Sequence, residues 1–169
     1  MDTFFEQIVP IKKTAKEFIL LFLVWLLAGV LAAFLVLFVL GPAFGLIAAG
    51  LIFYGAFHLS KRFFIEFEYI VTNNILDIDK IIAKSSRKRI VSIDIADISE
   101  IKKYNPANSV KREHETRVLA CDPNDQNAFE ITAKGEHDTL KIIIAPNDRI
   151  KEGIIKSLPK YIGNSAFRV

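Results

Sequence analysis

The chain has 169 residues, of which 51% are hydrophobic and 24% are charged, and its formal net charge is +3. This small positive excess does not indicate a nucleic-acid-binding protein, and the single cysteine, Cys121, excludes an intramolecular disulfide. Five of the eight glycines lie between residues 29 and 55, inside an apolar region. No glycine-rich phosphate-binding loop is therefore indicated.

Residues 18–59 contain no Asp, Glu, Lys or Arg. This run is about twice the length that one helix needs to cross a hydrocarbon layer of about 30 Å. Gly41-Pro42 lies near its middle, and this dipeptide favours a turn. We therefore expect a transmembrane hairpin with helices at about 18–40 and 43–60. The expected division of the chain is an N-terminal cytoplasmic or interfacial segment over 1–17, the hairpin over 18–60, a cytoplasmic domain over 61–162 and a tail over 163–169.

Basic residues flank the hairpin on both sides, since Lys12, Lys13 and Lys16 precede it and Lys61 and Arg62 follow it. The turn between the helices carries no charge. Because basic flanks stay in the cytoplasm, we expect a multi-pass plasma-membrane protein with both termini cytoplasmic. A cleaved signal peptide is the competing interpretation, but the first apolar run is longer than such a peptide requires.

The first eleven residues precede this basic flank and include the apolar side chains of Phe4 and Ile8. Their composition is compatible with a short helix at the membrane interface. Pro10 limits the length of such a helix.

Small residues recur four positions apart in both apolar helices, at Gly29 and Ala33 and at Gly45 and Ala49. Small side chains let helix backbones approach closely in lipid. Two uses are open: packing of the hairpin on itself, which we favour, and assembly of several copies or subunits through the hairpin.

From Phe64 onward the apolar pattern changes to a period of two, which is typical of strands. Asn73-Asn74 is suited to a hairpin turn because Asn tolerates positive φ, and a second turn is expected at Ser85-Ser86. Centring the strands on these turns gives the cross-strand pairs Val71–Leu76, Tyr69–Ile78, Ile65–Ile82, Ile78–Ile93 and Leu76–Ile95. All fall on one face, which favours an antiparallel meander.

Further strands are expected at 116–121, 128–133 and 139–145, while 97–104 is ambiguous between strand and helical turn. Asn147 can cap a following helix. The apolar stripe of that helix would be Ile150, Ile154, Leu158 and Tyr161. The fold class is therefore α+β: a two-helix hairpin followed by a bent antiparallel sheet or open barrel of six to seven strands with a C-terminal helix.

The segment 68–81, Glu-Tyr-Ile-Val-Thr-Asn-Asn-Ile-Leu-Asp-Ile-Asp-Lys-Ile, followed by Arg87-Lys88-Arg89, resembles an uncharacterised family of small bacterial membrane proteins. That family has an N-terminal transmembrane hairpin and a bacterial pleckstrin-homology-like (PH-like) domain. The resemblance implies a fold and a location in the bacterial inner membrane. It carries no known activity, and the lipid-binding residues of eukaryotic PH domains do not transfer, because the corresponding turn, Asn73-Asn74, is uncharged.

A basic run, Lys84-Ser85-Ser86-Arg87-Lys88-Arg89, surrounds the second predicted turn. The strand order returns this turn toward the bilayer, where each positive charge gains about 1 kcal/mol near anionic lipid. The lipid-headgroup contacts we predict are Lys84, Arg87, Lys88, Arg89, Lys61 and Arg62. The alternative is a solvated basic turn.

Acidic residues on the opposite face of the meander, Glu68, Asp77, Asp79 and Asp94, would lie across from one another in the predicted register. Two explanations are open, a solvated acidic face and a bound cation or basic partner. His114 and His137 have no partner at metal-ligand spacing. We expect no metal site, no cofactor and no enzymatic activity.

These patterns together favour a membrane-anchored PH-like binding or scaffold module of unknown ligand, with an unknown protein partner and no nucleic acid. The alternative is a structural subunit of a membrane complex, assembled through the hairpin.

Overall fold

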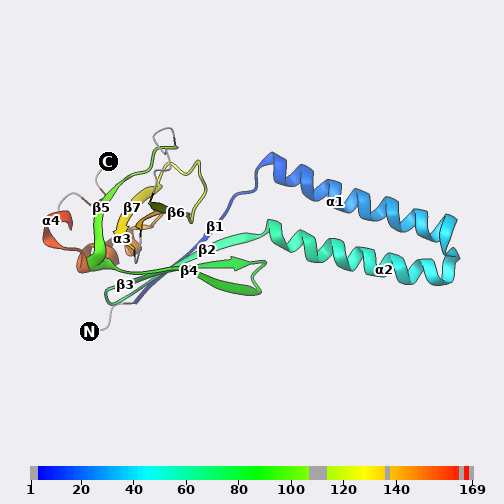
Figure 1. Ribbon diagram of the computed structural model, residues 1–169, viewed down its shortest axis with the longest axis horizontal. Coiled ribbons are helices and arrows are strands. Elements are labelled where there is room, and N and C mark those ends of the chain that lie inside the picture. Colours follow the sequence, from blue (N-terminus) through cyan, green and yellow to red (C-terminus); the bar gives the residue numbers. More distant parts are fainter. Residues whose placement is uncertain (1–3, 107–113, 136–137, 164–165, 168–169) are drawn as a thin grey trace. The chain divides into compact units, whose positions relative to one another are not determined.

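The computed structural model describes residues 4–106, 114–135, 138–163 and 166–167, without the side chain of Tyr161. The chain divides into two compact units. The first, the sheet unit, comprises residues 1–11, 66–81 and 86–169; the second, the hairpin unit, comprises residues 12–65 and 82–85. Figure 1 labels most of their helices and strands.

The hairpin unit is built from two apolar helices joined by a tight turn. Helix α1 (Ala15–Phe34) continues into a π-helical segment, Leu35–Val39, and helix α2 spans Gly41–Ser60. The turn depends on Gly41, whose φ of 68° is costly for a residue with a side chain, and Pro42 lies in the first turn of α2. A 3-10 turn, Lys61–Phe63, follows α2.

The outer surface of this hairpin is apolar almost throughout. Leu37, Phe38 and Phe44 are each more than 70% exposed. Both helices are long and apolar enough to cross a membrane. An apolar surface of this kind marks a site of interaction with a membrane or with another protein.

The first sheet has the order β1-β2-β3-β4, with β1 Phe4–Pro10, β2 Ile65–Thr72, β3 Ile75–Ile82 and β4 Ser86–Asp94. The interfacial helix expected over 1–11 is therefore wrong, because Phe4–Pro10 form a strand. Strand β1 pairs antiparallel with β2, from Phe4 opposite Thr72 to Pro10 opposite Glu66. Pro10 is tolerated because it ends a strand at the edge of the sheet. The two apolar helices are thus an insertion between two neighbouring strands.

The first predicted turn agrees with the structure and the second does not. Asn73 has φ 53°, and the N–H of Ala83 donates to the carbonyl of Phe64, which continues the predicted pairing of Ile65 with Ile82. The second turn is centred on Ala83 and Lys84, with φ of 50° and 55°. It lies two residues before the predicted centre at Ser85-Ser86.

The pairing of β3 with β4 is also shifted, but by two residues rather than by the four that a turn centred two residues earlier gives in a regular hairpin. The N–H of Ile95 donates to the carbonyl of Asn74, whereas the predicted register placed Ile95 opposite Leu76. A shift of two residues keeps the same side chains facing inward. Leu76, Ile78 and Ile93 are therefore still buried.

The second sheet has the order β5-β7-β8-β6, in which β6 runs parallel to β8. Its strands are β5 Ile98–Lys103, β6 Glu115–Leu119, β7 Phe129–Lys134 and β8 Thr139–Ile144. A 3-10 turn, Ile95–Asp97, joins β4 to β5. The ambiguous segment 97–104 is thus mainly strand, and the described residues hold eight strands, one more than predicted because of β1.

Helix α3 (Asp148–Ser157) begins where predicted, since the side chain of Asn147 accepts a hydrogen bond from the N–H of Ile150 at 2.9 Å. Ile150, Ile154 and Leu158 of the predicted stripe are buried, while the side chain of Tyr161 lies outside the described part. A short helix, α4 (Lys160–Gly163), follows Pro159. The predicted α+β class is confirmed.

Two side chains of the first sheet bind backbone groups in the segments that directly follow β6 and β8. The buried Tyr69 hydroxyl donates to the carbonyl of Ala120 at 2.5 Å and accepts from the N–H of Ala145 at 3.2 Å. From β1, the side-chain amide of Gln7 donates to the carbonyl of Ala145 and accepts from the N–H of Asn147. The N-terminal strand is therefore an integral part of the domain.

Candidate functional site

The hairpin unit gathers basic side chains at one end of the two antiparallel helices. Lys13 precedes α1, Lys61 and Arg62 follow α2, and Lys84 lies in the turn that hydrogen-bonds Phe64. The ammonium of Lys13 lies 3.2 Å from the centre of the Phe64 ring. The uncharged Gly41 turn is at the other end, so the charge is confined to one end of the hairpin.

The basic run does not act as one group, because its two arginines are already paired. Arg87 contacts the carboxylate of Glu68 at 2.8 Å, and Arg89 contacts Asp77 at 3.0 Å and Asp79 at 3.2 Å. Lys84 and Lys88 are exposed and form no ion pair with the described carboxylates. The two lysines are thus the free charges of the run.

The acidic face of the first sheet is only partly solvated, because Asp94 is exposed and Asp77 is half-buried whereas the other two carboxylates are buried. Glu68 is fully buried and Asp79 is only 3% exposed. The like charges are relieved within the chain itself, because the arginines of β4 pair with the carboxylates of β2 and β3. Asp94 serves differently, since its side chain accepts a hydrogen bond from the N–H of Ala96.

Glu6, on β1, adds a further carboxyl beside this cluster. Burial raises the pKa of Glu68, and a hydrogen bond with Glu6 raises it further, whereas Arg87 opposes the rise. The charges of Glu6 and Asp79 act in the same direction as burial. The sequence did not reveal this group, because the partner strand of β1 lies beyond the hairpin.

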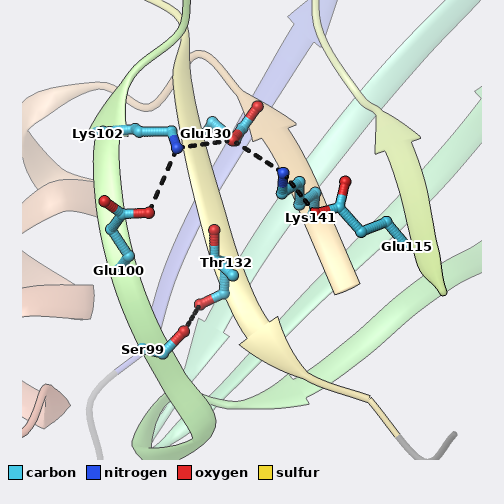
Figure 2. A network of polar contacts seen from close by, with 7 residues as sticks. All are labelled: Ser99, Glu100, Lys102, Glu115, Glu130, Thr132 and Lys141. Carbon is cyan, nitrogen blue, oxygen red and sulfur yellow. Dashed lines mark hydrogen bonds and ion pairs between the residues drawn. The ribbon is translucent and has the colours of Figure 1, made fainter. Parts of the chain in front are cut away.

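A second polar network crosses the four strands of the other sheet, and Figure 2 shows its alternating charges. Lys102 lies 3.3 Å from both Glu100 and Glu130, and Lys141 lies 2.8 Å from Glu115 and 4.0 Å from Glu130. Burial alone would lower the pKa of Lys102, but hydrogen bonds to Glu130 and Glu100 outweigh it and raise the pKa. The network thus links side chains of all four strands through ion pairs.

The remaining candidate reactive groups are isolated. Cys121 is buried, as predicted, and burial raises the pKa of its thiol to about 12, so it is a poor nucleophile. His114 approaches only Asp138, at 3.7 Å, while His137 lies outside the described residues. Within the described part of the chain no three His, Cys, Asp or Glu side chains are grouped to hold a metal ion.

The comparison with protein families decides the classification. A family model described as a bacterial PH-like domain (DUF6106) matches residues 1–163. The chain belongs to this family. The match covers the hairpin together with both sheets and α3, which confirms the resemblance seen in residues 68–81 and Arg87–Arg89. No curated protein and no solved structure matches the chain.

The family model identifies a PH-like domain in this chain, and PH-like domains are generally non-catalytic binding or scaffold modules. Its first strand precedes the hairpin and its second strand follows it. The hairpin is therefore inserted between two neighbouring strands of this domain.

The four small residues predicted to pack helices fall in different environments within the hairpin. Gly45 and Ala49 are buried, and a Cβ on Gly45 would come within 2.7 Å of the Cα of Val36. Nothing lies within 4 Å of a Cβ placed on Gly29, and Ala33 is exposed. Ala28 and Ala32 take the buried positions on α1 instead. Assembly through Gly29 and Ala33 remains a prediction.

Proposed function

We propose that this protein is a membrane-anchored PH-like binding module of the bacterial inner membrane, with two membrane spans and both termini in the cytoplasm. The anchor is the hairpin, whose exposed surface is apolar and whose basic residues all lie at one end. The positive-inside rule places that end in the cytoplasm.

The module contacts anionic lipid headgroups through the free basic residues at this end. The observation that carries this proposal is the grouping of the Lys84 turn with the hairpin, through the hydrogen bond from Ala83 to Phe64. Lys61 and Arg62 belong to the same unit. Lys88, in the sheet unit, is the other free lysine of the basic run, whereas Arg87 and Arg89 chiefly neutralise buried carboxylates.

The contact can be tested with the full-length protein in lipid nanodiscs. A fluorophore is attached to Ser85→Cys in a Cys121→Ala background, and quenching by nitroxide-labelled headgroups is compared between anionic and neutral lipid. We expect stronger quenching in anionic lipid, because each lysine gains about 1 kcal/mol there. The difference should shrink in Lys84→Gln/Lys88→Gln and in high salt.

The matched control is Lys151→Gln/Lys156→Gln, which removes the same charge from α3. If quenching is the same in both lipids, or if the control reduces it as much as the test variant does, headgroup contact by the turn is wrong. The comparison between lipids separates charge-dependent contact from the proximity that the covalent anchor alone imposes.

A further inference from the structure

The open edges of the two sheets border one groove. Strand β4 ends the first sheet and β6 ends the second, so within the described strands each has a neighbour on one side only. Residues of both strands line a groove of about 530 Å³, together with part of β8 and the connections beside it. Binding sites for ligands commonly measure roughly 300–1,000 Å³.

The edge of β4 offers backbone groups to a further strand. The N–H of Ile95 is directed toward β3, where it donates to the carbonyl of Asn74. Because alternate residues of an antiparallel strand direct their N–H and C=O groups to opposite sides, Ser92 presents both groups to the open edge. Unpaired groups of this kind bind extended segments readily.

The side chains of the groove favour a particular chemistry. Val91, Ile93, Val118 and Leu140 supply apolar surface. The charged lining residues are Asp94, Asp97, Asp138 and Lys134, so three carboxylates face one ammonium. An extended segment presents alternate side chains to opposite faces. A segment with apolar residues on one face and basic residues on the other complements this lining.

We propose that the groove binds an extended polypeptide in which basic and apolar residues alternate, added as a fifth strand to the free edge of β4. The inference names the partner of the binding module proposed above. It does not depend on lipid contact by the Lys84 turn, and neutral lipid removes that contact from the test.

The test uses full-length protein in neutral-lipid nanodiscs and a fluorescent hexapeptide of alternating Lys and Val. Fluorescence anisotropy measures binding, with empty nanodiscs as the blank. We expect binding at least about tenfold tighter than that of the matching Glu-Val peptide, and a loss of about tenfold in Asp97→Asn/Asp138→Asn. The control Asp148→Asn/Glu152→Gln, which removes the same charge from α3, should bind as the wild type does.

The contribution of backbone hydrogen bonds to binding is tested by altering first the peptide and then the protein. A Lys-Val peptide N-methylated at alternate amides keeps its charge but cannot pair as a strand, and its binding should be lost. Ser92→Pro removes the outward N–H, whereas Ser92→Ala retains it, so only the proline variant should bind weakly. Thermal unfolding of both variants checks the fold.

Several results would overturn the proposal. These are the absence of binding by the Lys-Val peptide at millimolar concentration, equal binding of the Glu-Val or N-methylated peptide, and an unchanged affinity in the double Asp variant. The methylated peptide leaves the protein unaltered, so its result stands even if Ser92→Pro does not fold.

Discussion

The side chains of Tyr69 and Gln7 each form hydrogen bonds with backbone groups that lie outside the strand pairing. The Tyr69 hydroxyl lies between Ala120 and Ala145, and Gln7 binds Ala145 and Asn147 at the start of α3. A buried polar backbone group without a partner costs about 1–3 kcal/mol. These two side chains therefore fix where the second sheet lies against the first.

Glu68 makes the stability of the domain depend on pH. Because folding raises its pKa, the folded state holds the proton more tightly than the unfolded state does. The free energy of unfolding should fall as the pH rises from the ordinary value of 4.5 through the raised pKa, by at most about 1.4 kcal/mol per pH unit, and then level off. Glu68→Gln cannot ionise and should lose this decline.

Urea unfolding at a series of pH values, followed by the near-ultraviolet circular dichroism of the tyrosines, measures this effect. Glu66→Gln, at a less buried position on the same strand, is the control and should keep the wild-type slope. An unchanged slope in Glu68→Gln would show that another group carries the pH dependence.

At the scale of elements, the hairpin depends on one close approach between its helices. A Cβ on Gly45 would lie 2.7 Å from the Cα of Val36, and a backbone atom cannot move aside as a side chain can. We expect Gly45→Ala to destabilise the hairpin by about 1–3 kcal/mol. Gly50→Ala is the control, because nothing lies within 4 Å of its Cβ.

The single tryptophan reports on this interface, since Trp25 of α1 stacks on Phe53 of α2 at 6.2 Å. Titration with a denaturing detergent, followed by Trp25 fluorescence, should show an earlier transition for Gly45→Ala than for Gly50→Ala. Equal transitions for the two variants would mean that the helices do not depend on this contact.

The elements that the sequence predicts correctly are those with local signals. Asn147 and its apolar stripe identify α3, and Asn73 identifies the first turn. Strand β1 has no local signal of its pairing, because its partner follows the entire hairpin. The turn at Ala83-Lys84 lacks the Gly or Asn that normally marks positive φ. The basic run itself is visible in the sequence. Because the turn is displaced, however, the predicted register did not place Arg87 and Arg89 beside the carboxylates with which they pair.

At the scale of the whole molecule, the sheet unit should still fold when the hairpin is removed, provided that β1 is retained. Pro10 lies opposite Glu66, so an Asn-Gly turn can join residues 4–10 directly to residues 66–163. We expect this chain to be soluble, folded and monomeric. Residues 66–163 alone lack Gln7 and the Phe5 ring that packs against Gly153, and should unfold at a lower temperature or aggregate.

Circular dichroism melting and size-exclusion chromatography compare the two chains, and a synthetic peptide of residues 4–10 should restore the shorter one. If the chain without β1 melts at the same temperature as the joined chain, the N-terminal strand is dispensable.

Because the hairpin separates β1 from β2 in the sequence, completion of the first sheet also depends on how the hairpin is inserted. Residues 11–64 separate the two strands, so at about 5–20 residues per second the ribosome makes β2 several seconds after β1. If the hairpin spans the membrane as proposed, insertion of one helix alone would leave β1 and β2 on opposite sides of the bilayer. Completion of the first sheet therefore requires that both helices cross the membrane or that neither does.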